Sequence, residues 1–205
     1  MNGPDPLRAI REASAIWIMN WLNWVNRCLV WLLCCLTVIL GPPATFALFY
    51  AAHYSIHGAE LTVGELAASV RAYFWQSWLW MLANLAVGAG LWGLAAAGSA
   101  LGAGRAVGWA VALIGLFWLG IQYYALPIFM LQERKRIWRA WGSAARVAFS
   151  APLFTLITFG LALVLGLVSL ILVAPLAMGG AGLIVVLAAQ ATFERLQTFH
   201  LPEEE

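Results

Sequence analysis

Long apolar runs, separated by short polar or charged segments, set the pattern of this chain. Bilayer hydrocarbon is about 30 Å thick and a helix rises about 1.5 Å per residue, so a spanning helix needs roughly 20 apolar residues. The pattern predicts an all-α fold, a polytopic transmembrane helical bundle with five full spans. The strands of an outer-membrane barrel are alternating segments of about ten residues, which this pattern lacks. The predicted spans are Trp24 to Leu40, Trp78 to Ala97, Val107 to Leu131, Phe154 to Val173 and Leu176 to Phe193.

The first 22 residues have a different pattern, with apolar and aromatic residues spaced for one face of a helix. Asp5 is a suitable N-cap, and Pro6 follows at the first helical position. We therefore expect an amphipathic helix that lies at the membrane interface. Its predicted apolar face contains Leu7, Ile10, Ser14, Trp17 and Trp21.

A proline pair interrupts the apolar sequence between Trp24 and Ile56. Proline removes a helical hydrogen bond, and the residue before it is pushed out of helical geometry, so Gly41-Pro42-Pro43 is a strong break. An unbroken helix from Trp24 to Ile56 would be about 50 Å long, more than the hydrocarbon needs. Two arrangements remain: a long kinked first span, or a helical hairpin that turns at Gly41 to Pro43 and returns through a short re-entrant segment, Ala44 to Ile56.

The distribution of basic residues favours the hairpin. Cytoplasmic loops of membrane proteins carry an excess of lysine and arginine. Of the 11 Lys and Arg residues, the hairpin leaves only Arg105 outside, whereas the kinked span also places Arg8, Arg11 and Arg27 there. We therefore expect a multi-pass protein whose N-terminus and C-terminus are both cytoplasmic.

Composition excludes a water-soluble class. The 205 residues are 63% hydrophobic and 10% charged, and the mean hydropathy is +0.86; soluble domains are about 25% charged. The formal net charge of +2 is too small and scattered to indicate nucleic-acid binding. Membrane lipids are thus the first partner that the sequence predicts.

A further pattern, T-x-x-x-G-P-x-A-T-x-A-L-x-Y, follows the first predicted span. It resembles the YesL-like family of bacterial integral membrane proteins, except that Pro43 adds a second proline. The resemblance implies location in a bacterial plasma membrane and a loose accessory role beside carbohydrate uptake, because family members often neighbour carbohydrate-utilisation genes. It rests on Thr37, Gly41, Pro42, Ala44, Thr45, Ala47, Leu48 and Tyr50.

We interpret the chain as a single membrane domain, residues 1–205, with a second proline turn at Pro175 between the last two spans. Its parts are an interfacial helix (1–22), a helical hairpin (24–56), a cytoplasmic connection (57–77), two spans (78–131), a basic cytoplasmic loop (132–153), two spans (154–193) and a cytoplasmic tail (194–205).

Three amides are the most informative polar residues in the predicted spans. Asn84, Gln122 and Gln190 lie near the middle of their segments, where an amide can form hydrogen bonds between helices. Small residues point the same way, because Gly88, Gly90 and Gly93 would let helices approach closely. We interpret the amides as contacts between helices in preference to a substrate site.

Histidine and cysteine do not add a strong chemical signal. His53 and His57 are one helical turn apart, with Glu60 one turn further on; such spacing can hold a metal, but the third ligand is unconvincing. Cys34 and Cys35 are adjacent and do not form a C-x-x-C pair. Known catalytic and nucleotide-binding motifs are also missing. We predict no enzyme activity, no metal and no cofactor.

Two functions remain open. The first is a non-enzymatic accessory or structural protein that associates with itself or with another membrane protein, and the basic loop would serve as a docking surface for lipid headgroups or for that partner. The second is a small permease with a polar site where the helix breaks near Pro42. The docking residues are Arg134, Lys135, Arg136, Arg139 and Arg146.

Overall fold

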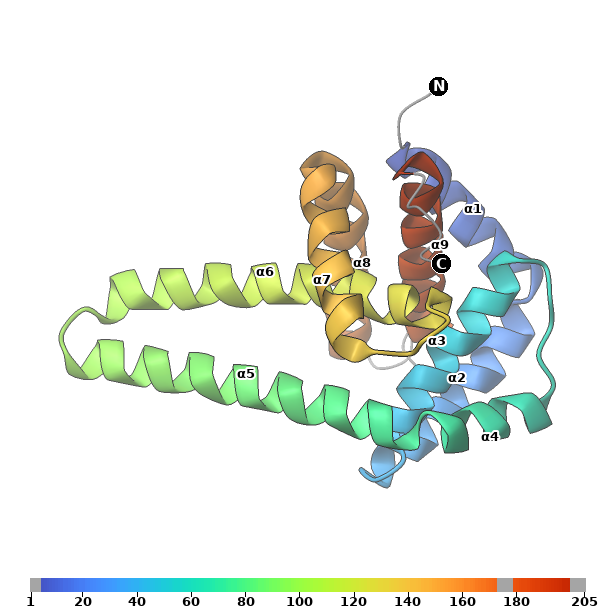
Figure 1. Ribbon diagram of the computed structural model, residues 1–205, viewed down its shortest axis with the longest axis horizontal. Helices are drawn as coiled ribbons and strands as arrows, with labels where there is room; N and C mark the ends of the chain where they lie inside the picture. Colours follow the sequence, from blue (N-terminus) through green and yellow to red (C-terminus); the bar gives the residue numbers. More distant parts are fainter. Residues whose placement is uncertain (1–4, 173–178, 200–205) are drawn as a thin grey trace.

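The computed structural model describes residues 5–172 and 179–199, and this part of the chain is all-α, as predicted. Within residues 5–172, short connections join consecutive helices (Figure 1). The helices within these ranges are α1 (Pro6–Met19), α2 (Trp21–Leu36), α3 (Gly41–Ile56), α4 (Val63–Ala72), α5 (Phe74–Ala100), α6 (Gly104–Leu131), α7 (Ile137–Ser150), α8 (Pro152–Leu172) and α9 (Ala181–Phe199).

The chain folds back between α2 and α3, but the turn precedes the prolines. Residues 37–40 form it, and Val38 adopts a left-handed φ of 58°. The Thr37 hydroxyl stabilises the turn, because it donates to the Cys34 carbonyl at 2.7 Å and accepts from the Leu40 amide at 3.2 Å. Gly41, Pro42 and Pro43 instead form the first turn of α3, where the N–H that proline lacks has no helical partner to lose.

Two segments that the sequence analysis treated as connections contain helices. Within 57–77, α4 begins with a capping box in which Thr62 and Glu65 exchange hydrogen bonds. Within 132–153, α7 buries Ala140, Ala144 and Val147, a spacing of four and three residues that defines one helical face. The predicted basic loop is therefore mostly an amphipathic helix.

Helices α5 and α6 form a long hairpin that extends away from the other helices, while α7 and α9 run across its direction (Figure 1). Three helices in the described ranges are long and apolar enough to cross a membrane: Phe74–Ala100, Gly104–Leu131 and residues Pro152–Ser169 of α8. Helix α2 is apolar but shorter. The structure thus supports a helical protein with three candidate spans, and it does not establish the five full spans that the sequence predicts.

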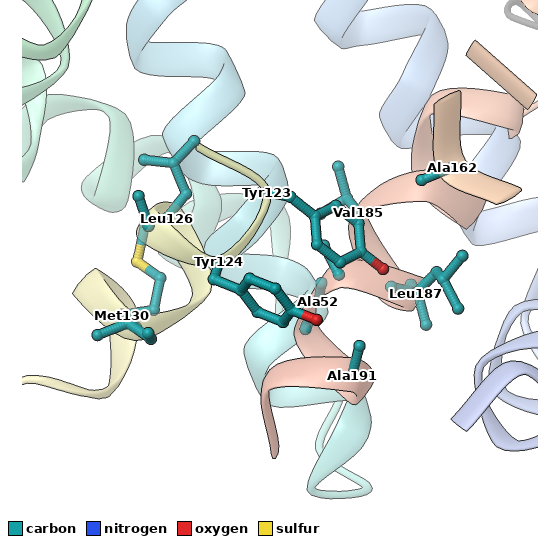
Figure 2. Packing of buried hydrophobic residues seen from close by; sticks show 14 of the residues in the cluster. Ala52, Tyr123, Tyr124, Leu126, Met130, Ala162, Val185, Leu187 and Ala191 are labelled. Carbon is teal, nitrogen blue, oxygen red and sulfur yellow. The ribbon is translucent and has the colours of Figure 1, made fainter. Parts of the chain in front are cut away.

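The core lies where α3, the second half of α6 and α9 meet. Tyr123 and Tyr124 of α6 point toward α9, with Ala52 of α3 close to Tyr124 (Figure 2). Both tyrosines are buried, and Tyr124 shares a hydrogen bond of 3.2 Å with the hydroxyl of Thr155 on α8. Small residues of α3 and α9, such as Ala188, allow these helices to approach closely.

Helix α1 packs along α9 in the opposite direction. Ala9 and Ala13 are its buried residues, whereas Leu7, which the sequence analysis placed on the apolar face, is 71% exposed. The indole N–H of Trp17 donates to the Gly179 carbonyl at 3.1 Å. The two alanines are thus the fully buried residues of α1, and Ile10, Ile16 and Trp17 pack beside them against the core.

Candidate functional site

A network of amides and indoles joins α5, α6 and α7. The Gln122 side-chain oxygen accepts the indole N–H of Trp80 on α5 at 2.9 Å and that of Trp141 on α7 at 3.2 Å. The Asn84 side-chain oxygen accepts the indole N–H of Trp118 on α6 at 2.9 Å. The predicted contacts between helices are therefore present for Asn84 and Gln122.

The spacing of these residues explains how the network forms. Each helix of the hairpin carries a tryptophan followed four residues later by an amide, Trp80 and Asn84 on α5 and Trp118 and Gln122 on α6. Residues four apart lie on the same face of a helix. When the two antiparallel helices pair, each amide meets the indole of the other helix, so the hydrogen bonds cross the interface in both directions.

The network consists of neutral groups that are almost fully paired. The Asn84 amide N–H donates to the Trp80 carbonyl of its own helix at 2.8 Å, while the buried Gln122 amide nitrogen has no hydrogen-bond partner among the described residues. The rings of Trp118 and Trp141 also pack at 5.4 Å between centroids. Such an arrangement fixes the orientation of three helices, because moving any of them breaks a partly buried hydrogen bond.

The third predicted amide belongs to a separate, charged network between α1 and α9. Gln190 donates to Glu12 at 2.6 Å, and Glu12 accepts from Arg8 at 2.8 Å. Arg8 also lies 3.8 Å from Glu194. Burial raises the pKa of the Glu194 carboxyl, and the charge of Arg8 partly opposes that shift.

Arg195 is a buried charged residue that the sequence analysis did not single out. Only 2% of it is exposed. Its guanidinium donates to the Ser150 hydroxyl at 2.5 Å and lies 5.6 Å from the ring centroid of Phe154. The sequence signal for a buried ion was an arginine directly after Glu194 at the end of an apolar run. The sequence analysis instead places both residues in the cytoplasmic tail.

The residues predicted to form proline turns have different positions. Gly41, Pro42 and Pro43 are buried. The neighbouring Thr45 hydroxyl donates to the Gly41 carbonyl and accepts the Trp31 indole N–H, both at 3.0 Å. Pro175 lies outside the described residues.

Four of the five predicted docking residues are exposed: Arg134, Arg136, Arg139 and Arg146. Lys135 instead caps the C-terminal end of α6, where its ammonium donates to the Met130 carbonyl at 2.6 Å. Burial lowers the pKa of Lys135. These four arginines therefore lie at the surface, and the docking surface stays a prediction, whereas Lys135 has a structural role.

The two histidines lie together at the end of α3. Their ring centroids are 4.8 Å apart, and the Nδ1 atom of His57 is 2.7 Å from the His53 carbonyl. His57 also packs edge-on against Phe193 of α9. The Nδ1 atom of His57 is therefore already engaged by the backbone of its own helix.

Together, the hairpin and its amide network define an all-α protein with helices suited to a membrane. Comparisons with protein-family models, curated protein sequences and solved structures find no match to this chain. The resemblance to YesL-like proteins therefore stays a prediction from the residues that carry it.

Proposed function

We propose that this chain is a non-enzymatic integral membrane protein that associates, through its α5–α6 hairpin, with itself or with a larger membrane complex. The observation that carries this proposal is the contrast between the inside and the outside of the hairpin. The side-chain oxygens of Asn84 and Gln122 accept hydrogen bonds between its two helices, and an apolar stretch of 18 residues in α5 has none of its residues buried. That apolar surface is available for lipid and for another membrane helix.

The glycines of α5 support the same proposal. Gly88, Gly90 and Gly93 have open space where a side chain would be, so no neighbour from the described part of the chain occupies this surface. The sequence analysis expected these glycines to allow close helix packing, and a helix of a second chain is the partner that remains for them. Lipid tails cover the surface when no such partner is bound.

The packing around Pro42 favours this role over that of a permease. A permease would need a polar cavity reached by Pro42, Thr45 and Asn84. Pro42 is buried, and the side chains of Thr45 and Asn84 are already hydrogen-bonded to their own helices and to tryptophans. The accessory role beside carbohydrate uptake is the part of the proposal that rests on the family resemblance alone.

The test is purification in a gentle detergent, with the mass of the intact particle and the identity of co-purifying chains as readouts. Gly90→Ile fills the open surface and should abolish the association. Gly142→Ile is the matched control, because Gly142 is exposed on α7 and also has open space around it. Recovery of wild-type protein only as a monomer, with specific solute uptake after reconstitution, would overturn the proposal.

A further inference from the structure

A groove between α3 and α4 combines aromatic walls with one carboxylate. Its volume is about 200 Å³, smaller than the roughly 300 to 1,000 Å³ of pockets for drug-sized ligands. A small ligand or a single headgroup would fill it. The groove is lined by Tyr50, Glu65, Ala68, Ser69, Ala72 and Tyr73.

The geometry of the walls follows from helical spacing. Glu65, Ala68, Ser69 and Ala72 repeat at three and four residues along α4, so they form one face of that helix. Alanine and serine leave room beside this face, and the ring of Tyr50 on α3 stands opposite. The groove therefore runs along the side of α4, not at its end.

The two tyrosines form adjoining aromatic walls. The ring centroids of Tyr50 and Tyr73 are 6.0 Å apart, and the ring planes are inclined by 56°. The Tyr50 hydroxyl lies 3.2 Å from the Tyr54 hydroxyl, which holds its ring in place. Inclined aromatic faces beside an open volume are typical of sites that bind organic cations, because the faces carry negative electrostatic potential.

The carboxylate at the groove is charged and held in position. One Glu65 oxygen accepts hydrogen bonds from the Thr62 amide and hydroxyl, both at 2.8 Å. These hydrogen bonds lower the pKa of Glu65. Of the lining residues, which all belong to the described part of the chain, Glu65 alone is charged. The groove thus selects for positive charge.

We propose that this groove binds a small organic ammonium group, with the tyrosine faces against its methyl or methylene groups and Glu65 opposite its charge. The ammonium belongs either to a free amine such as choline or to the headgroup of a zwitterionic phospholipid. The groove lies on α4 just before α5, whose apolar segment is exposed, so both sources can reach it. This inference does not depend on the proposed association through α5 and α6.

The test uses the full-length protein in nanodiscs of phosphatidylglycerol, which lacks an ammonium group. Choline is titrated against it by ligand-observed NMR and compared with 3,3-dimethylbutanol, its uncharged carbon isostere. An aromatic face contributes a factor of about two to five to binding a cation. We therefore expect saturable choline binding that is at least about threefold tighter than that of the isostere.

Three variants test the carboxylate charge, a control charge outside the groove and the Tyr50 hydroxyl. Glu65→Gln removes the charge and keeps a residue suited to the capping box; we expect choline binding to weaken at least about threefold. Glu60→Gln removes the same charge from an exposed position outside the groove and should leave binding unchanged. Tyr50→Phe keeps the aromatic face and should also retain binding.

A second arm distinguishes the two sources of the ammonium. Protein released from nanodiscs that contain phosphatidylethanolamine is analysed by native mass spectrometry for retained lipid. Retention by wild type and loss in Glu65→Gln would assign the groove to the headgroup, and choline binding without retained lipid would assign it to a free amine. Equal binding of choline and its isostere, or equal effects of Glu65→Gln and Glu60→Gln, would overturn the inference.

Discussion

Replacing Gln122 by leucine tests whether the amide network holds α5, α6 and α7 together. The substitution preserves most of the side-chain volume and removes the acceptor of two hydrogen bonds, from Trp80 and Trp141. A hydrogen bond between membrane helices contributes about 0.6 to 2 kcal/mol. We expect the free energy of unfolding to fall by roughly 1 to 3 kcal/mol, because two partly buried indole N–H groups lose their acceptor.

Asn84→Leu is the substitution against which the stability loss of Gln122→Leu is compared. Among the described residues, Asn84 accepts one hydrogen bond from another helix, so its removal should cost about half as much as the removal of Gln122. The assay is reversible unfolding in mixed micelles with increasing denaturing detergent, followed by circular dichroism. A Gln122→Leu protein as stable as wild type, or less affected than Asn84→Leu, would refute the assignment of the network.

A pair of tryptophan substitutions on α5 controls for the loss of an indole. Trp80→Phe removes a donor to Gln122, and Trp92→Phe makes the same change at a residue that is 79% exposed. Trp80→Phe should destabilise the protein and Trp92→Phe should not. In a double-mutant cycle, Trp80→Phe and Gln122→Leu should be coupled by about 0.6 to 2 kcal/mol. Strict additivity of the two changes would show that this hydrogen bond does not contribute.

Two further predictions concern close packing and pH. Gly182→Ala should cost about 1 to 3 kcal/mol in the same assay, because its new methyl would lie 2.8 Å from Trp24 Cε3; Gly90→Ala, with open space around it, should be neutral or stabilising. Because the pKa of Glu65 is lowered in the folded state, its contribution is complete at neutral pH and is lost as pH falls through that lowered pKa. The stability difference between wild type and Glu65→Gln should therefore shrink on acidification, and a constant difference would contradict the hydrogen-bonded carboxylate.

The sequence predicted those elements whose signals are local and strong. The N-cap at Asp5 and proline at the first position of α1 are present, and the long apolar runs became α5, α6 and α8. The sequence analysis did not predict helices α4 and α7, because it interpreted their charged segments as cytoplasmic connections. Thr62 and Glu65 have capping-box spacing, and the alanines of α7 repeat on one face, so both signals were available.

Features that depend on tertiary contacts were harder to predict from the sequence. Sequence position placed Asn84 and Gln122 near mid-span, but only the pairing of α5 with α6 shows that each meets an indole. Glycine spacing predicted close helix contacts at Gly88, which has open surroundings, whereas Gly98 lies against Val107. Whether a small residue faces a neighbour depends on the rotation of the helix, which spacing alone does not determine.

The length of the outer part of the α5–α6 hairpin can change without a change in the packing of the core. Since this part extends beyond the other helices (Figure 1), matched removal or addition of whole turns on both helices would leave the packing of α3 and α9 untouched. Bilayers differ in thickness by a few ångströms, and mismatch with a helix carries a free-energy cost. Evolution can thus adjust this chain to a thinner or thicker membrane by changing its protruding arm alone.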